Sequence, residues 1–445
     1  MIPSAVLSKF MCRKTARYRA SIRPPRNDIH YHQHRSHRLN AQEGQTETTQ
    51  VQHPLRVAII GGGGHVGLPF GLALCDCGHT VTLVDLNEAQ LDTIRSGQMP
   101  FQEINADQLL PRVLESGRLH CSTSFTALSE QDVIIVTIGT PVDEYLDPSL
   151  RAFDQVMEDV FQHCRPGQLL IIRSTVFPGV TQRLGRLVAE RDLQIDVSYC
   201  PERIAQGRAL LELTQLPQLV SGCTPQAAQR AASFFSDFGQ EVIELSPVEA
   251  ELGKLFTNSY RYINFAISNQ FYMLAQRYEA DFDRIYHAIT YKYPRMNGFA
   301  RAGFAGGPCL LKDTMQLASF NHNLLTLGQT AMAVNEGLPG FIVERLKKNH
   351  DLTGLTVGIL GMGFKGNCDD PRSSLSYKLR KVLTLECRRV LCTDPFIDSS
   401  DFVSLETIQQ ESDILILGAC HDEYRSLQTT KPLIDVFGFT TRQEP

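Results

Sequence analysis

Short apolar runs separated by glycine-rich turns dominate both ends of the chain, whereas the middle has a different pattern. The runs at residues 57–60, 81–84 and 133–136 have the length of buried β-strands rather than of helices. Such strands, when they alternate with helical segments, are typical of parallel sheets with helices on both faces. We therefore predict that the first part of the chain folds as a doubly wound α/β sheet.

The first apolar run leads into the sequence GGGGHVGLP, in which Gly62, Gly64 and Gly67 have the GxGxxG spacing. Glycines at this spacing allow a tight turn, a close approach of backbone to a pyrophosphate, and close packing of a helix on a strand. Asp85 ends the second run, where a carboxylate can bind the ribose hydroxyls and would repel a 2′-phosphate. This order favours NAD over NADP. A glycine turn in some other α/β fold is the alternative.

Polar residues follow three later strands. Thr140 comes after the run at 133–136, and Ser174 and Thr175 come after the run at 169–172. Loops at the carboxyl ends of parallel strands face the ligand, so hydroxyl and backbone donors there would meet the cofactor. Glu202 follows a further strand and could face the same crevice. A surface or helix-capping role is the alternative for Glu202.

From residue 247 to about 277 the apolar positions repeat with a helical period. This is long for one helix, and it suits a spine that joins two domains or a dimer contact. Lys254 and Asn258 lie four residues apart and so share one face. A solvated lysine beside a polar neighbour is the alternative.

Past residue 349 the opening pattern returns, with a second GxGxxG at residues 361–366. Two Rossmann-like halves are therefore expected on either side of a helical middle, with one nucleotide bound to each. The alternative for the second half is a structural or dimerising domain with an empty crevice.

The stretch GFAGGPCLLKD places a nucleophile, a cation and a carboxylate close together. Pro308 suits the first position of a helix, and Cys309 would then fall in the first turn, where free N–H groups favour a thiolate. Lys312 and Asp313 follow one turn later on the same side. A small core residue at the start of a capped helix is the alternative for Cys309.

Composition narrows the class of protein. The 445 residues suit two or three domains, and no run approaches the roughly 18 apolar residues of a membrane span. Residues 1–50 hold nine of the 43 Lys and Arg residues but three of the 48 Asp and Glu residues, so the remaining body is acidic, which argues against nucleic acid. The basic head is expected to be a disordered extension or the product of an upstream start codon, with an organellar presequence as a third interpretation. Twelve cysteines without CxxC pairs predict no disulfide framework, no metal site and a reducing compartment.

Together these motifs resemble those of the nucleotide-sugar 6-dehydrogenases, the UDP-glucose/GDP-mannose dehydrogenase family, from about residue 55 to 436. The matching stretches stand in family order: GGGHVGLP, GTP, RSTVFPG, CPER, ELGKLFTN, GGPCLLKD and GFKGNCDDPRSS. The resemblance implies two Rossmann-like doubly wound domains joined by a central helical domain with a long spine helix. The expected boundaries are a basic, disordered extension at 1–54, an NAD-binding domain at 55–246, a dimerising central domain with the catalytic cysteine loop at 247–350, and a UDP-sugar-binding domain at 351–445.

The resemblance also implies an activity, the NAD-dependent four-electron oxidation of the C6 alcohol of a UDP-sugar to the uronate, which supplies polysaccharide biosynthesis. The intermediates would be a thiohemiacetal and a thioester on Cys309. Lys254 and Asn258 would stabilise the oxyanion, and Asp313 or Glu202 would act as bases. The implied NAD contacts are Gly62, Gly64, His65, Val66, Gly67, Asp85, Thr140, Ser174 and Thr175. The implied substrate contacts are Phe304, Gly306, Lys365 and Arg372.

Departures from the family pattern bear on the sugar. Leu311 stands where many members have proline, and Gln206 stands where the UDP-glucose enzymes often carry glutamate. The triplet at 201–203 looks more like that of the UDP-N-acetylhexosamine branch. A UDP-N-acetylhexosamine such as UDP-N-acetylmannosamine is therefore expected ahead of UDP-glucose, with GDP-mannose third.

Two other classes of protein remain as alternatives. A two-electron NAD-dependent β-hydroxyacid dehydrogenase has no use for Cys309 or for a second nucleotide half. A nucleotide-sugar binding or scaffold protein without activity would have no need of the complete set of candidate catalytic residues. We expect a cytoplasmic homodimer that takes a UDP-sugar as substrate and binds neither nucleic acid nor a membrane.

Overall fold

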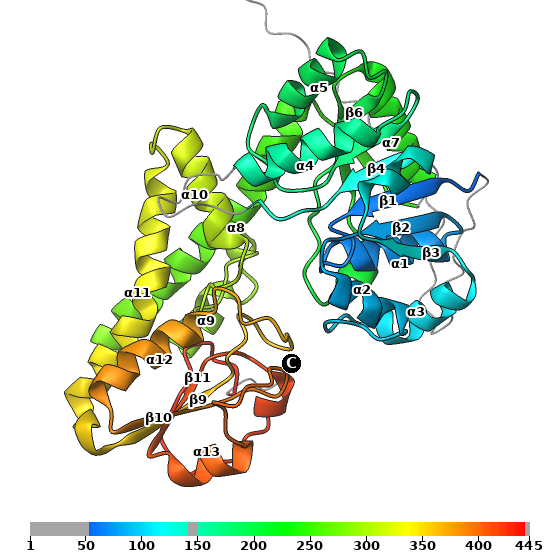
Figure 1. Cartoon of the computed structure of the whole chain (residues 1–445). Coiled ribbons are helices and arrows are strands. Elements are labelled where there is room, and N and C mark those ends of the chain that lie inside the picture. Colours follow the sequence, from blue (N-terminus) through cyan, green and yellow to red (C-terminus); the bar gives the residue numbers. More distant parts are fainter. Residues whose placement is uncertain (1–52, 141–149, 238, 441–445) are drawn as a thin grey trace, which may run out of the picture. The chain divides into compact units, whose positions relative to one another are not determined.

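The structure, a computed structural model, describes residues 53–140, 150–237 and 239–440 (Figure 1). The basic head up to residue 52 and the end of the tail from residue 441 therefore lie outside the described residues. The first part of the chain forms an eight-stranded sheet in the order β3-β2-β1-β4-β5-β6-β7-β8. The strands are β1 (Arg56–Ile60), β2 (Thr80–Val84), β3 (Leu119–Ser122), β4 (Val133–Val136), β5 (Leu169–Ile172), β6 (Asp196–Tyr199), β7 (Gln218–Gly222) and β8 (Val242–Glu244).

The register of this sheet brings several strand ends level with one another. Neighbouring strands from β3 to β6 are parallel, whereas β7 runs antiparallel to β6. Ile60 pairs with Val136, Val136 with Ile172, and Ile172 with Tyr199. The residues that follow these four strands therefore share one edge of the sheet, which is where open α/β sheets bind ligands.

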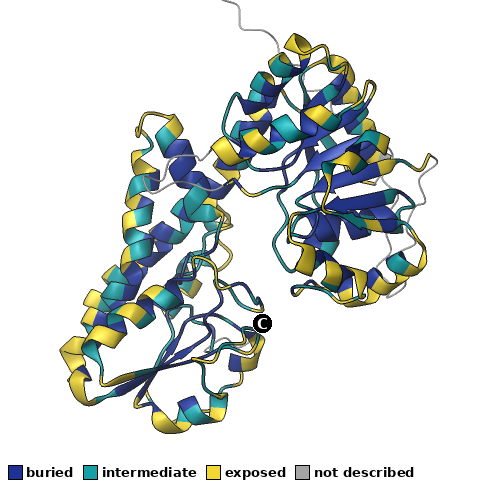
Figure 2. Ribbon diagram, viewed as in Figure 1, coloured by how far each residue is buried: buried dark blue, intermediate teal, exposed yellow. Residues whose placement is uncertain are grey.

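Helices cover the sheet and shield its apolar strands. They are α1 (Gly67–Asp76), α2 (Glu88–Arg95), α3 (Ala106–Glu115), α4 (Leu150–His163), α5 (Val180–Glu190), α6 (Ala209–Glu212) and α7 (Pro225–Asp237). Figure 2 shows the strands in the buried colour, while the helices turn exposed faces outward. β1, β4 and β5 are buried over nearly their whole length, as their continuous apolar runs predict for strands covered on both faces.

A single helix, α8 (Pro247–Arg277), begins the middle of the chain, and this confirms the predicted spine. Its start is fixed by a capping box, in which the side chains of Ser246 and Glu249 each bond to the backbone N–H of the other residue. Pro247 lies in the first turn. The helices α9 (Phe282–Thr290), α10 (Leu310–Phe320) and α11 (Thr326–Asn349) follow, and α10 and α11 both pack against α8.

A second, parallel sheet forms the last part, in the order β10-β9-β11-β12. Its elements are β9 (Thr356–Leu360), α12 (Leu375–Glu386), β10 (Arg389–Thr393), α13 (Leu405–Glu411), β11 (Ile414–Leu417) and β12 (Leu433–Ile434). Short 3-10 helices complete the described chain at Phe125–Glu130, Pro294–Met296, Leu352–Gly354 and Asp422–Tyr424.

The two glycine motifs lead into different crossovers. In the first half, α1 begins at the last glycine of the motif, Gly67. In the second half, residues 361–374 form a loop and the helix begins only at Leu375. Asp394 nevertheless accepts the N–H groups of Met362 and Gly363, at 2.6 and 2.9 Å, from the end of the neighbouring strand. The second half thus keeps the strand and acid of a Rossmann unit with a longer crossover.

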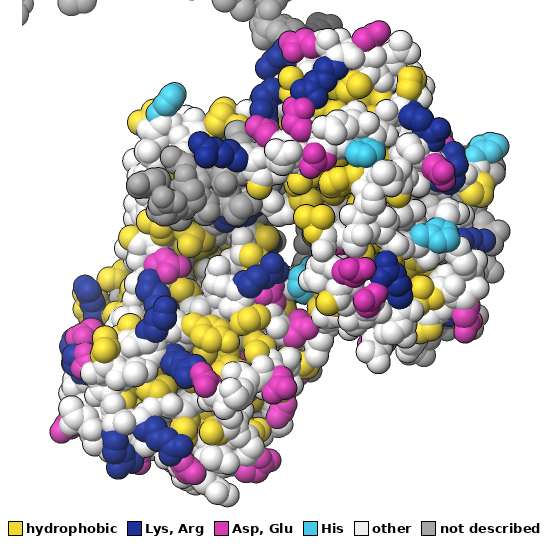
Figure 3. Space-filling model, viewed as in Figure 1, with side chains coloured by type: hydrophobic (Ala, Val, Ile, Leu, Met, Phe, Trp, Pro, Cys, Tyr) yellow, Lys and Arg dark blue, Asp and Glu magenta, His cyan; other side chains and the backbone are white. Residues whose placement is uncertain are grey.

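Membrane spans and metal clusters are both missing from the described part of the chain. No described helix is long and apolar enough to cross a membrane. No group of three or more His, Cys, Asp or Glu residues within the described ranges could hold a metal ion. On the face shown in Figure 3, basic and acidic side chains are interspersed.

Candidate active site

The turn after β1 has the close backbone approaches that its glycines predict. A Cβ atom on Gly62 would lie 2.7 Å from the carbonyl oxygen of Ile59, and one on Gly67 would lie 2.4 Å from that of Gly61. Val66 is the N-cap of α1 and provides no capping side chain, while the N–H of Leu68 is bonded to the carbonyl of Gly64 and Pro69 has no N–H. The close approach of the glycines fits the pyrophosphate of a dinucleotide.

Asp85 and His65 lie on either side of this turn. One carboxylate oxygen of Asp85 accepts the N–H of Gly63 at 2.9 Å, which fixes the acid beside the turn, as the ribose site requires. The ring of His65 packs on Phe101 with centroids 4.0 Å apart, and a ring nitrogen lies 3.1 Å from Nε2 of Gln206. Burial, with the nearby Arg372 charge, lowers the pKa of His65.

The three predicted hydroxyl residues lie together at the carboxyl edge of the sheet. Thr140 donates its hydroxyl to the carbonyl of Thr175 at 2.6 Å, and Ser174 donates to that of Val136 at 3.3 Å. The parallel pairing of β4 with β5 accounts for this, because it brings the loops after these strands side by side. Thr140 also receives Nζ of Lys312, which reaches its carbonyl and hydroxyl oxygens at 3.1 and 3.2 Å. The first turn of α10 is thus in direct contact with the residues that follow β4.

Two predictions about Cys309 are wrong. The helix α10 begins at Leu310, so Cys309 is its N-cap, and Pro308 precedes the helix instead of opening it. The pKa of the Cys309 thiol is raised, first by desolvation and then by the carboxylate of Asp313. Lys254 and Lys312 oppose this rise without reversing it. The direction of this shift disfavours the thiolate at this position, although the residue itself is exposed.

The other expected polar groups gather around Asp313, which is buried in the first turn of α10. Asn258 on α8 donates Nδ2 to one carboxylate oxygen at 2.6 Å, and Nζ of Lys312 lies 3.0 Å from the other. The packing of α8 against α10 makes the Asn258 contact possible. The structure therefore joins residues that are 55 positions apart in the sequence.

Lys254 lies one turn before Asn258, on the same face of α8. Desolvation lowers its pKa, while the negative groups Asp313, Cys309 and Glu202 oppose that effect. Among the described residues, Lys254 has no hydrogen-bond or ion-pair partner, so its donors are available to a ligand. An unpaired, desolvated cation beside a cysteine is suited to stabilising an oxyanion.

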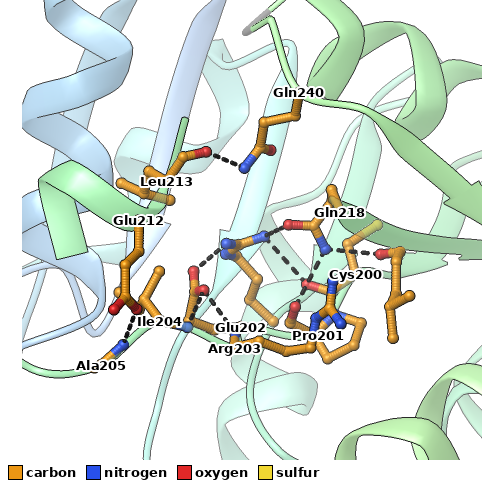
Figure 4. A network of polar contacts seen from close by, with 12 residues as sticks. Cys200, Pro201, Glu202, Arg203, Ile204, Ala205, Glu212, Leu213, Gln218 and Gln240 are labelled. Carbon is orange, nitrogen blue, oxygen red and sulfur yellow. Dashed lines mark hydrogen bonds and ion pairs between the residues drawn. The ribbon is translucent and has the colours of Figure 1, made fainter. Parts of the chain in front are cut away.

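Glu202 follows β6 in a more constrained setting than expected. It forms an ion pair with Arg173, and its other oxygen accepts the N–H groups of Arg203 and Ile204 at 2.6 and 2.9 Å. Figure 4 shows Glu202 within a network that includes Cys200 and Gln218. Sequence reasoning missed Arg173, although it directly precedes the predicted Ser174. An arginine at the end of a continuous apolar strand was the available signal, since a buried cation needs a nearby carboxylate.

Two of the predicted substrate residues, Phe304 and Gly306, lie in the segment that leads to Cys309. This segment, residues 303–309, is called the cysteine loop, and it meets loops of the second sheet. Phe304 is buried and packs edge-on against Phe437, with ring centroids 5.9 Å apart. A Cβ atom on Gly306 would lie 2.9 Å from the carbonyl oxygen of Ser373, so only glycine allows this approach. The cysteine loop is therefore closely packed against the segments that follow β9 and β12.

Lys365 and Arg372 occupy the loop after β9. Nζ of Lys365 donates to the carbonyl of Gln206, and Arg372 forms a two-pronged pair with Asp370, with Nη2 2.6 Å from Oδ2. Gln206 also donates to Asp370 at 3.1 Å. Both basic side chains are thus held by this chain's own acceptors, and Arg372 is near enough to Cys309 to affect its pKa.

A cavity of about 400 Å³ lies between α8 and the segment that follows β12. Its lining includes Tyr272, Arg301, Arg345 and Phe437. It contains none of the site residues expected from the sequence, although Phe437 connects it to Phe304.

Comparison with known proteins agrees with this arrangement. Three models of the UDP-glucose/GDP-mannose dehydrogenase family match: the NAD binding domain at residues 55–239, the central domain at 248–337 and the UDP binding domain at 358–442. A UDP-N-acetyl-D-mannosamine dehydrogenase of Methanocaldococcus jannaschii is 30% identical, over 83% of this chain and 87% of that protein.

Solved structures show the same likeness. A UDP-D-ManNAc dehydrogenase from Pyrococcus horikoshii has a TM-score of 0.78 and 27% identity, over 84% of this chain and 91% of that one. A UDP-glucose dehydrogenase from Pyrobaculum islandicum has a TM-score of 0.80 and 26% identity, over 87% and 95%. The first domain's match covers the glycine turn and Asp85, and the cofactor is NAD. The chain therefore belongs to the UDP-glucose/GDP-mannose dehydrogenase family and is an NAD-dependent oxidoreductase.

Proposed function

We propose that this protein oxidises the C6 alcohol of a UDP-N-acetylhexosamine to the carboxylate, with release of two NADH and consumption of one water. The observation that carries the proposal is the gathering of Cys309, Lys254, Asn258 and Asp313 beside the dinucleotide edge of the first sheet. A two-electron oxidation of an alcohol needs no nucleophile, whereas passage to the acid requires the aldehyde to be captured.

NAD, held by the glycine turn, Asp85 and the hydroxyl cluster of Thr140, Ser174 and Thr175, supplies the hydride acceptor for each oxidation. Asp313, acting through water or with Lys254, takes the proton of the C6 hydroxyl in the first oxidation. Burial, the hydrogen bond from Asn258 and the ion pair with Lys312 orient its carboxylate for this task.

Cys309 then adds to the aldehyde carbon, forming a C–S bond while the thiol proton passes to the former carbonyl oxygen. Because the thiol pKa is raised, this proton must leave as the bond forms, and a positive group beside the developing oxyanion favours the step. Lys254, with its donors unoccupied by described residues, supplies that charge, and the Asn258 amide adds a donor.

Loss of the second hydride and of the hydroxyl proton leaves a thioester on Cys309. Water adds to its carbonyl, the C–S bond breaks, and the thiol returns with a free carboxylate. Asp313 or Glu202 orients that water and receives its proton. Both carboxylates lie within electrostatic range of Lys254.

The loop after β9 and the cysteine loop are proposed to bind the UDP-sugar, through Phe304, Gly306, Lys365 and Arg372. The similarity to UDP-N-acetyl-D-mannosamine dehydrogenases supports an N-acetylhexosamine. So does the glutamine at position 206, where the UDP-glucose enzymes often carry glutamate. UDP-glucose is second, since a structure named for that activity is comparably similar. We retain the domain boundaries 55–246, 247–350 and 351–445, and we place the product in polysaccharide biosynthesis.

The decisive experiment counts NADH formed per sugar consumed by the purified full-length protein. UDP-glucose, UDP-N-acetylglucosamine, UDP-N-acetylmannosamine, UDP-N-acetylgalactosamine and GDP-mannose are offered separately. Two NADH per sugar on a UDP-N-acetylhexosamine support the proposal, and two on UDP-glucose alone correct the sugar. A ratio of one, or no NADH on any substrate, contradicts the cysteine mechanism.

We also propose a homodimer formed through α8. A stripe of exposed apolar side chains runs along this helix to its C-cap, Tyr278, at intervals of three, four and seven residues: Phe256, Tyr260, Ile267, Phe271, Leu274 and Tyr278. Side chains at this spacing share one helical face. An apolar stripe of this length is suited to burial against a second copy of the same helix.

A further inference from the structure

Arg173 is a buried cation that the proposed chemistry does not use. Its side chain has no exposed surface, and its guanidinium carbon lies 4.4 Å from the ring centre of Phe70 and 5.2 Å from that of Phe235. A charge in such surroundings is strongly destabilising unless it is paired. Among the described residues, Glu202 is the carboxylate that pairs with it, through Nη2 of the arginine.

The sheet register explains how the two groups meet. Arg173 directly follows β5, and Glu202 comes shortly after β6, the parallel neighbour of β5. β7 runs antiparallel to β6, with Ser221 opposite the last residue of β6, so that Gln218 at its start lies beside the residues that follow β6. Three strands thus deliver a cation, a carboxylate and an amide to one point.

Arg173 also holds the backbone that carries Glu202. Its Nη1 donates to Oε1 of Gln218 at 2.9 Å and to the carbonyl of Cys200 at 3.3 Å. Gln218 in turn donates to the carbonyl of Pro201 at 3.1 Å. Figure 4 shows Cys200, Pro201 and Gln218 gathered around Glu202. Both the carboxylate and the two residues before it are therefore tied to the same network.

The arrangement connects this network with the proposed catalytic centre. The Glu202 carboxylate has few ways to move, because its second oxygen is bound by the N–H groups of Arg203 and Ile204. Its charge is one of those that act on Lys254. A change at Arg173 would therefore reach Lys254 through Glu202.

We propose that Arg173 is a positioning residue, which orients the Glu202 carboxylate and holds it in place for the proposed catalytic centre. The inference rests on the proposed function, because the role of Glu202 belongs to that proposal. It goes further by assigning the task of fixing Glu202 to one buried side chain, in which charge matters as well as shape.

The test compares Arg173→Met, Arg173→Lys, Glu202→Gln and the double variant Arg173→Met with Glu202→Gln. Arg173→Met is expected to lower kcat about 10- to 100-fold, with the KM values for NAD and the UDP-sugar within about threefold of the parent. Arg173→Lys retains the charge and should recover part of the loss. In the Glu202→Gln background, removing Arg173 should change kcat less than about threefold, because the two residues act as a unit.

Arg183→Gln is the matched control, since Arg183 pairs with Asp154 on the outer helices α5 and α4. It should leave kcat unchanged. If Arg173→Met does not fold, Gln218→Met replaces it, because this variant removes one acceptor of the guanidinium and keeps the charge. A smaller loss of kcat that disappears in the Glu202→Gln background is then expected.

Two results would overturn the inference: independent, multiplying losses in the double variant, or an Arg173→Lys variant as inactive as Arg173→Met. Both results count only when the parent enzyme forms two NADH per sugar. Absence of NADH from the parent itself would instead reject the proposed function.

Discussion

At the scale of single residues, the candidate site consists of ionisable groups whose charges depend on one another. Desolvation lowers the pKa of Lys254 and raises that of Cys309, and each opposes the shift of the other. Asp313 favours the charged lysine and disfavours the thiolate. Desolvation thus favours the neutral form of both groups, and a positive charge on the lysine is most useful when an oxyanion forms.

Cys309→Ser should abolish complete turnover, because a serine hydroxyl is a much weaker nucleophile than sulfur at this position. Binding of NAD and UDP-sugar should change little, since no described residue depends on the sulfur for a hydrogen bond. Stopped-flow absorbance for NADH and calorimetric titration measure the two properties. Multiple turnovers at the parent rate would exclude the covalent route.

Lys254→Met should lower kcat by about 100- to 1,000-fold, as expected for the loss of one oxyanion donor. In the parent, activity should decline as pH rises through the lowered pKa of Lys254, so the alkaline limb lies below 10.5. Kinetics from pH 6 to 10 test both points. The exposed Lys348→Met is the control.

The same lysine affects stability in a known direction. Between its lowered pKa and 10.5 the unfolded chain binds more protons than the folded one, so this residue's contribution to stability rises with pH. Lys254→Met removes the burial penalty and should unfold at the same temperature as the parent or higher at pH 7. A large drop in the unfolding temperature would show that the lysine is a structural residue.

At the scale of elements, α8 carries the site and is anchored at its start. The carboxylate of Glu251 is fully buried and accepts the N–H groups of Gly179 and Thr181 at 2.6 and 2.8 Å, together with the Thr181 hydroxyl at 2.6 Å. This joins α8 to the first turn of α5. Because Lys254 and Asn258 lie one and two turns farther on the same face, the anchor also sets the rotation at which they meet α10.

Glu251→Ala should destabilise the protein by about 3 kcal/mol or more, because it leaves several buried donors without an acceptor. Urea unfolding gives the free energy. Glu249→Ala, which removes the exposed partner of the capping box on the same helix, should lose distinctly less. Equal losses in the two variants would contradict an anchoring role for Glu251.

The apolar stripe on α8 leads to a prediction about assembly. Replacing Tyr260 and Phe271 together by lysine should yield a monomer, because two charges would then enter a buried interface. Light scattering after gel filtration measures the mass. The control is Leu385→Lys on α12, which is 86% exposed and lies off the stripe. A parent protein that is already monomeric would reject the dimer.

At the scale of the whole molecule, the parts that the sequence predicted are those that depend on local patterns. Continuous apolar runs identified β1, β4 and β5, and the uninterrupted helical period identified α8. β3 was missed because it is short, only Leu119 of its residues Leu119–Ser122 is buried, and it is the edge strand of the sheet. The antiparallel direction of β7 relative to β6 was also missed, because the direction of a strand leaves no local signal in the sequence.

The site shows the same division. Motif spacing directed attention to Asp313 and Asn258, and the structure brings these two residues into contact. The protonation of Cys309 was predicted wrongly, because it depends on desolvation and on charges from α8 and α10 rather than on the helix start alone. Arg173 was overlooked because its importance arises from the register of three strands.

The length of α8 has a consequence for how this protein can change. The helix touches the first domain at Glu251 and the cysteine loop at Asn269, whose side chain bonds to both backbone groups of Gly303. A single inserted or deleted residue between these points would turn everything beyond it by about 100° around the helix axis. Gene variants with such a change should fail to produce enzyme, whereas insertions in the outer loops should be tolerated. The number of residues in α8 therefore matters to the active site as much as the side chains that the helix carries.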